Sequence, residues 1–174
     1  MWNEQIIMML LEGIKDTLYM TLTSTLIGYV IGLPMGILLT VTDKDGIHPN
    51  AAVYKVLDVI ANLIRSVPFL ILLIVLIPFT RFLIGRSYGP TATIVPLVIA
   101  AAPYIARMVE SSLKEVDAGV IEAARSMGAS NFTIVTKVML VEARTSLIVG
   151  ATISLGTILG YSAMAGTVGG GGLG

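Results

Sequence analysis

The sequence contains no cysteine and few charged residues. Cysteine is absent from all 174 residues, which excludes disulfides, thiolate catalysis and cysteine-ligated metals. Charged residues make up only 13% of the chain, its formal net charge is zero and no long basic run occurs, so nucleic acid is not expected as a partner. The single histidine, His48, has no second histidine to pair with, and no nucleophile–base arrangement is present. The sequence therefore predicts neither a metal site nor a hydrolase.

A nucleotide-binding P-loop is also missing. The pattern G-x-x-x-x-G-K-[ST] occurs nowhere in the chain. The glycine run 169–172 is not followed by lysine, and such a run is typical of a flexible turn. Any ATP hydrolysis linked to this chain must therefore come from a partner.

Apolar residues are abundant and fall in long blocks. They make up 55% of the sequence, and the mean hydropathy is +0.89. A helix that crosses a bilayer needs about 20 apolar residues. This composition predicts an all-α, polytopic membrane helical bundle that forms a single domain over residues 1–174. Four stretches reach or approach the required length: residues 18–41, 57–79, 91–108 and 147–164.

Small residues and prolines indicate how these spans pack. Gly28, Gly32 and Gly36 recur every fourth residue, which puts bare backbone on one face and predicts a close helix contact. Pro34 lies on an adjacent face and predicts a kink. Pro96 and Pro103 interrupt the third span, so we expect that span to pack against protein, because a freed carbonyl facing lipid would stay unsatisfied.

Polar residues inside two spans are candidates for a translocation pathway. Asp58, Asn62 and Arg65 share one helical face, and such groups are costly near hydrocarbon unless they face a partner or an aqueous cavity. An interfacial pair of Asp58 with Arg65 is the alternative. On the fourth span one face combines hydroxyls with a thioether, and it is contributed by Thr157, Tyr161 and Met164. Packing in the core explains Met164 equally well.

The longest polar segment, residues 110–143, predicts two short helices between the third and fourth spans. Asp117 can cap a helix that contains Glu122, Ala123 and Ala124 and that closes at Gly128 through a left-handed turn. Ser130 or Asn131 can start the next helix. An ordinary helical hairpin is the alternative interpretation, since glutamate and alanine are simply good helix formers.

Basic residues orient the chain in the membrane. Most of the 11 lysines and arginines lie in or beside the predicted first loop, residues 44–50, and the segment 110–143. By the positive-inside rule both are cytoplasmic, and the N-terminus lies outside.

Several segments resemble a known family. The run from Ile121 to Gly128, followed by Val138-Met139-Leu140, resembles the cytoplasmic EAA loop of ABC importer permeases, although the proline that usually follows the leucine is Val141 here. The segments 65–69, 101–110 and 160–166 are similar to the methionine-importer branch of these permeases.

This resemblance implies an importer rather than an enzyme. It implies a homodimeric permease of the bacterial inner membrane that moves methionine, L- and D-, by alternating access. The implied partners are a cytoplasmic ATPase dimer, which holds the ATP and Mg²⁺, and an external methionine-binding protein; no cofactor is expected in this chain. The residues implied to couple to the ATPase are Glu122, Ala123, Ala124, Gly128 and Leu140. The family usually has one more span after the position of Gly174.

Two alternatives remain open. The chain could be a permease for another small amino acid or organic solute, or a non-transporting membrane scaffold subunit. ATP-dependent uptake into sealed vesicles would separate a transporter from a scaffold.

Overall fold

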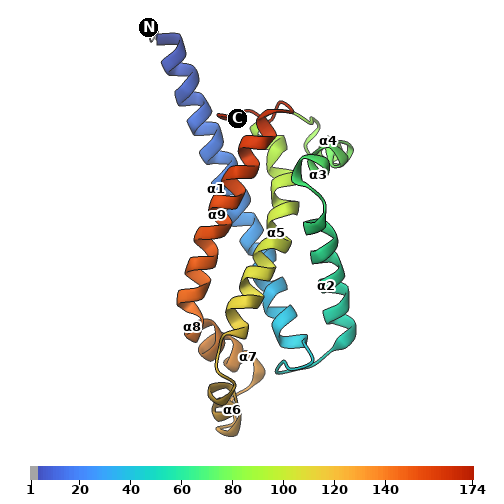
Figure 1. The fold of residues 1–174 in the computed structure, drawn as a ribbon, viewed down its shortest axis with the longest axis vertical. Coiled ribbons are helices and arrows are strands. Elements are labelled where there is room, and N and C mark those ends of the chain that lie inside the picture. The colour runs from blue at the N-terminus through green and yellow to red at the C-terminus, as the bar shows by residue number, and fades with distance from the viewer. Residues whose placement is uncertain (1–3) are drawn as a thin grey trace.

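The computed structural model describes residues 4–174, and all regular secondary structure in this range is helical. Three long helices, α1 (Glu4–Thr42), α5 (Pro90–Lys114) and α9 (Arg144–Gly166), run along one another and form the body of the molecule (Figure 1). All three are long and apolar enough to cross a membrane. The predicted spans 91–108 and 147–164 lie within α5 and α9.

The central helix is α5, which contacts α1 most extensively and also packs on α9. Both of its internal prolines, Pro96 and Pro103, are buried, which confirms that this span packs against protein. Ala101, Ile105 and Val109 face α1 and belong to the apolar core.

The glycines at positions 28, 32 and 36 of α1 lie in close contact with α5. A Cβ atom added at Gly32 would lie 2.6 Å from the carbonyl oxygen of Ala102, and one at Gly36 would lie 2.5 Å from that of Ala106. At Gly28 the closest atoms would be side-chain carbons at 3.0 and 3.1 Å. The two helices therefore approach each other as closely as bare backbone allows.

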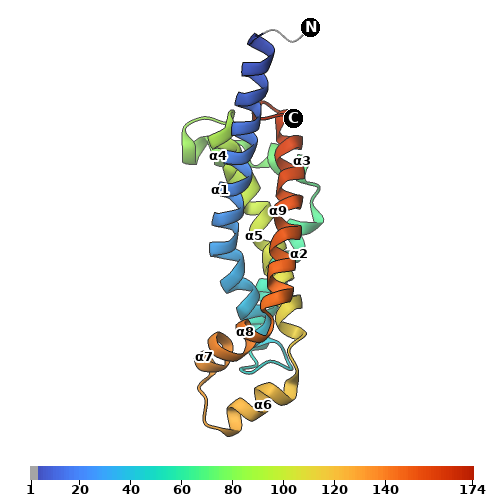
Figure 2. The same ribbon diagram turned by 90° about the vertical axis from the view of Figure 1, so that its left-hand side faces the viewer.

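The first helix is longer than the predicted span 18–41. It begins at Glu4 and continues through Pro34, and its N-terminal turns extend beyond the rest of the bundle (Figure 2). The predicted span begins only after the charged residues Glu12, Lys15 and Asp16. Charge ends a hydrophobic stretch but not a helix, because glutamate and lysine are strong helix formers.

The predicted span 57–79 is not one continuous helix, although α2 and α3, into which most of it divides, are together long and apolar enough for one broken span. The chain forms α2 (Ala51–Ser66) and α3 (Phe69–Val75), which are bent by 102° relative to each other. The break lies at Val67 and Pro68: the proline ring disfavours a helical Val67, whose ψ of 125° is extended. Helix α4 (Ile77–Ile84) follows and is closed by Gly85.

The remaining helices form the end of the molecule opposite the N-terminus. Helix α5 runs to Lys114, so the connecting segment starts later than the predicted 110–143. It contains α6 (Ala118–Ser126), α7 (Asn131–Thr133), the π-helical η1 (Ile134–Met139) and α8 (Leu140–Glu142), which leads into α9 (Figure 2).

Candidate functional site

Helix α6 is fixed at both ends by its own sequence. The Asp117 carboxylate accepts a hydrogen bond of 2.7 Å from the backbone N–H of Gly119. At the other end Gly128 has a φ of 83°, its N–H donates to the Arg125 carbonyl, and the Ala129 N–H donates to the Ala124 carbonyl. This pair of bonds is a Schellman motif, in which glycine adopts the left-handed position. The predicted cap at Asp117 and turn at Gly128 are confirmed as local structure.

The residues expected to couple to an ATPase divide into an exposed and an inward group. Glu122, Ala123 and Gly128 are exposed, whereas Ala124 is buried and Leu140 is half-buried against the core. Two large apolar side chains at the same end were not selected from the sequence: Met127 is 82% exposed and Phe132 is 77% exposed. The sequence did offer one indication of their exposure. Both residues lie beside the predicted helix caps, in a short connection where a bulky side chain cannot reach the core.

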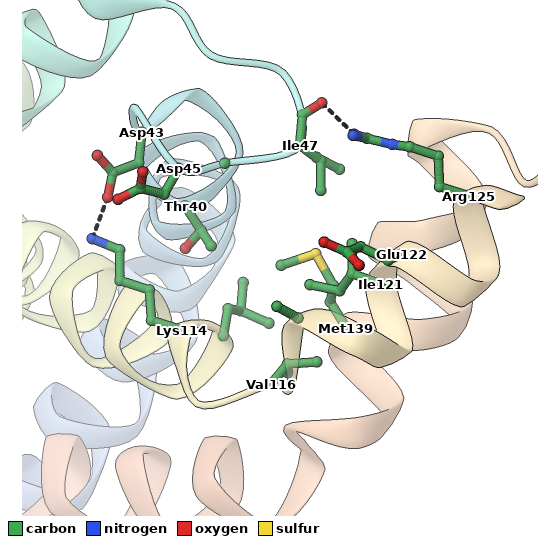
Figure 3. A pocket seen from close by; sticks show the side chains of 13 residues that line it. Thr40, Asp43, Asp45, Ile47, Lys114, Val116, Ile121, Glu122, Arg125 and Met139 are labelled. Atoms are coloured by element: carbon green, nitrogen blue, oxygen red, sulfur yellow. Dashed lines mark hydrogen bonds and ion pairs between the residues drawn. The ribbon is translucent and has the colours of Figure 1, made fainter.

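A cavity of about 490 Å³ separates α6 from the loop that joins α1 to α2 (Figure 3). Glu122 and Met139 border it from one side, and Asp45 from the other. The Arg125 guanidinium closes one edge by donating a 2.7 Å hydrogen bond to the Ile47 carbonyl.

The opposite edge of this cavity is closed by an ion pair between Lys114 and Asp43, at 2.7 Å. The hydrogen bond from Lys114 lowers the pKa of Asp43 below its ordinary value, although partial burial opposes this change. Asp43 directly follows α1 and Lys114 ends α5, so the cavity is framed by α1, α5 and α6.

A second polar cluster joins α2 to α5. Arg107 of α5 pairs with the Asp58 carboxylate and with Glu110 at 2.7 Å, and it donates to the Asn62 side-chain oxygen at 3.1 Å. Glu110 also accepts from Lys114 at 2.8 Å. The alternative pairing of Asp58 with Arg65 was therefore wrong, because the Asp58 carboxylate forms its ion pair with Arg107. Periodicity within one helix could not reveal a partner 49 positions away.

A smaller cavity, of about 150 Å³, lies beside the break between α2 and α3. Arg65 borders it, with its guanidinium carbon 6.0 Å from the centre of the Tyr104 ring. Phe69 and Tyr161 also line it, and their rings stack with centroids 4.6 Å apart. The hydroxyl of Thr157 lies 3.3 Å from that of Tyr104.

The structure thus brings three of the five pathway candidates together. Arg65 and Tyr161 line the small cavity and Thr157 adjoins it through Tyr104, whereas Asn62 belongs to the Arg107 cluster and Met164 lies outside the cavity lining. Phe69 and Tyr104 were missed. Phe69 is placed by the helix break, which periodicity does not reveal. Across residues 4–174 no group of three or more potential metal ligands is found.

Comparison with known proteins identifies the family. Residues 7–174 match the family described as "Binding-protein-dependent transport system inner membrane component". The chain belongs to this family. The D-methionine transport system permease protein MetI of Salmonella typhimurium is 52% identical over 164 residues, which cover 94% of this chain and 76% of that protein. The same-named protein of Escherichia coli K12 is also 52% identical, with the same coverage.

Solved structures agree with this assignment. An inward-facing structure of the MetNI methionine ABC transporter matches 99% of this chain and 80% of its own, with a TM-score of 0.97 and 51% identity. An amino acid ABC transporter solved with histidines matches 97% of this chain and 76% of its own at a TM-score of 0.78, but at 24% identity it supports the fold alone.

These comparisons confirm the all-α fold and the resemblance to importer permeases of the methionine branch. As a member of this family, the chain is a membrane component of a transport system and not an enzyme.

Proposed function

We propose that this permease forms the translocation pathway of an ATP-driven importer for methionine. The observation that carries the proposal is the identity of about half of all residues with D-methionine permeases over 94% of the chain. In this proposal two copies of the chain form the pathway, a cytoplasmic ATPase dimer binds the ATP and Mg²⁺, and an external binding protein delivers methionine.

Helix α6 is proposed to dock on the ATPase. The capped ends of α6 hold Glu122, Ala123 and Gly128 in a fixed, exposed position, and the apolar side chains of Met127 and Phe132 beside them suit insertion into a partner's groove. Ala124 and Leu140 would act from inside, by seating α6 and its neighbours on the core.

The pathway is proposed to pass the face of α9 that carries Thr157, Tyr161 and Met164, opposite Asn62 and Arg65 of α2. The aromatic cavity beside Arg65 supports this route, because it combines a cation with apolar walls. In the proposed orientation the α6 end is cytoplasmic and the N-terminus is outside, which agrees with the basic residues Lys44, Arg125 and Lys137 at the α6 end.

The proposal is tested by uptake into proteoliposomes that contain this chain, its ATPase and its binding protein. ATP inside the vesicles should drive accumulation of radiolabelled L- or D-methionine, and a non-hydrolysable ATP analogue should not. Competition by a panel of amino acids checks the substrate. If another amino acid is accumulated and methionine is not, the chain is a permease for that solute. A vesicle that accumulates no amino acid or other organic solute would favour a scaffold role.

A further inference from the structure

Arg65 stands apart from the neighbouring cations because no carboxylate neutralises it. Two other cations on this side of the bundle, Arg107 and Lys114, each pair with two carboxylates. Among residues 4–174 no aspartate or glutamate lies within ion-pairing distance of Arg65, and no hydrogen bond from its side chain is formed. Arg65 is exposed and has no counter-charge in this chain, so its guanidinium is free to bind an anion from outside the chain.

The surroundings of Arg65 form a cavity rather than a flat surface. Arg65 lies over the Tyr104 ring, and the helix break at Pro68 turns Phe69 inward, where it stacks on Tyr161 with the two rings within 7° of parallel. The cavity has a volume of about 150 Å³, which is enough for a group the size of benzene. It therefore holds a small organic fragment and not a large solute.

We propose that Arg65 and this cavity bind the carboxylate end of an amino-acid solute. The planar guanidinium matches a carboxylate through two parallel hydrogen bonds. The stacked rings of Phe69 and Tyr161 supply an apolar wall for the carbons next to that carboxylate. The site thus requires a solute with an anionic carboxylate and an uncharged side chain. This inference rests on the proposed function only in taking the solute to be an amino acid.

A cysteine placed in the cavity wall tests the inference. Ala100 lines the cavity, and because the chain has no cysteine, Ala100→Cys provides its only thiol. The complete complex with its ATPase is placed in lipid nanodiscs, and the rate of reaction with a small water-soluble thiol reagent is measured with increasing methionine or methioninol, which lacks the carboxylate. Methionine should slow the reaction several-fold, and methioninol should have little effect.

The matched variants are Arg65→Gln and Arg86→Gln in the Ala100→Cys background. Arg65→Gln should raise the methionine concentration needed for protection by roughly ten- to a hundredfold, as expected for loss of hydrogen bonds to a charged group. It should also reduce the preference for an anionic over a cationic reagent. Arg86 is exposed in the loop before α5, so its substitution should change neither result.

Three outcomes would overturn the inference. Equal protection by methionine and methioninol would show that Arg65 does not read the carboxylate. Protection by anionic lipid in the nanodisc, with no effect of methionine, would assign Arg65 to a lipid phosphate. A thiol that does not react in any nucleotide state, at Ala100 and equally in Leu72→Cys at a second lining position, would show that the cavity is closed to solutes. Failure of methionine uptake with protection by other amino acids would instead refute only the proposed substrate.

Discussion

Gly128 holds the end of α6 through its backbone and not through packing. Its φ of 83° lies in the left-handed region, and an added Cβ would meet no atom within 4 Å. Gly128→Val should therefore act by strain alone, at about 1–2 kcal/mol or more for a β-branched residue. We expect ATP hydrolysis driven by the binding protein to fall with membrane insertion intact. Gly128→Asn, which tolerates this conformation, should stay near the unmodified chain, and equal activity of both variants would remove the coupling role from this turn.

Gly36 is a residue at which space, and not conformation, is limiting. A Cβ there would lie 2.5 Å from the Ala106 carbonyl oxygen and 2.6 Å from the Val109 Cβ. Gly36→Ala should force α1 away from α5 and destabilise the chain by about 1–3 kcal/mol, seen as a lower melting temperature in detergent. Gly156→Ala on α9 is the control, because its Cβ would meet nothing within 4 Å. A drop of the same size in both variants would contradict a specific contact between α1 and α5.

Asp43 makes the stability of the α1 end depend on pH. Its pKa is lowered in the folded chain by the hydrogen bond from Lys114, so it stabilises the fold above the ordinary carboxyl pKa of about 3.9, and this stabilisation is lost as the pH falls toward the lowered value. Asp43→Asn should lower the melting temperature at pH 6, and the difference from the unmodified chain should shrink as the pH is lowered below the ordinary carboxyl pKa. The exposed Asp45 is the control, since Asp45→Asn should have little effect at either pH.

At the scale of elements, α2 is attached to the bundle mainly by polar contacts. Ala61 is its only buried residue, whereas Arg107 of α5 contacts Asp58 and Asn62 on it. Arg107→Ala would remove one partner from Asp58 and one from Glu110, which keeps Lys114, so we expect a cost of about 1–3 kcal/mol. Hydrogen exchange should increase throughout α2 and much less in α9. The exposed pair of Lys44 and Asp45 is the control, since Lys44→Ala should change neither helix.

The sequence was informative for elements whose signals are local. The third and fourth spans, the cap at Asp117 and the turn at Gly128 all follow from composition or from single residues with one preferred backbone state. The break at Val67 was missed because the apolar run continues across Pro68, so hydropathy stays high where the backbone cannot remain helical. The start of α1 was missed for the opposite reason, since hydropathy drops where the helix continues.

The candidate sites were only partly predictable, because their contacts join distant positions. The Arg125 side chain bonds to the Ile47 carbonyl, and Arg107 bonds to Asp58; neither pairing leaves a periodic trace in the sequence. The face shared by Asn62 and Arg65 was visible from helical spacing. Asn62 and Arg65 nevertheless belong to different clusters, because Arg107 of α5 contacts Asn62 whereas Tyr104 of α5 lies beside Arg65.

At the scale of the whole molecule, α5 links the two candidate sites. Its Lys114 end frames the cavity beside α6, and Tyr104, ten positions earlier, lines the cavity beside Arg65, so about 15 Å of continuous helix separates them. A packed helix moves as a rigid body. A change in the position of α6 on the ATPase can therefore reach the pathway through α5, and we expect the accessibility of the pathway to depend on the nucleotide state.

Met164 tests whether this dependence reaches α9. Met164 is 44% exposed on the face of Thr157, and Leu159 is 45% exposed but lies about 140° around the helix, at 100° per residue. In the complex in nanodiscs, Met164→Cys should react with a membrane-impermeant thiol reagent, and the rate should change when ATP and vanadate trap another state. Leu159→Cys should stay unreactive in every state if its face is covered by lipid or protein. If Met164→Cys and Leu159→Cys react equally, or if the Met164→Cys thiol never reacts, Met164 lies outside the water-filled path and its role is helix packing.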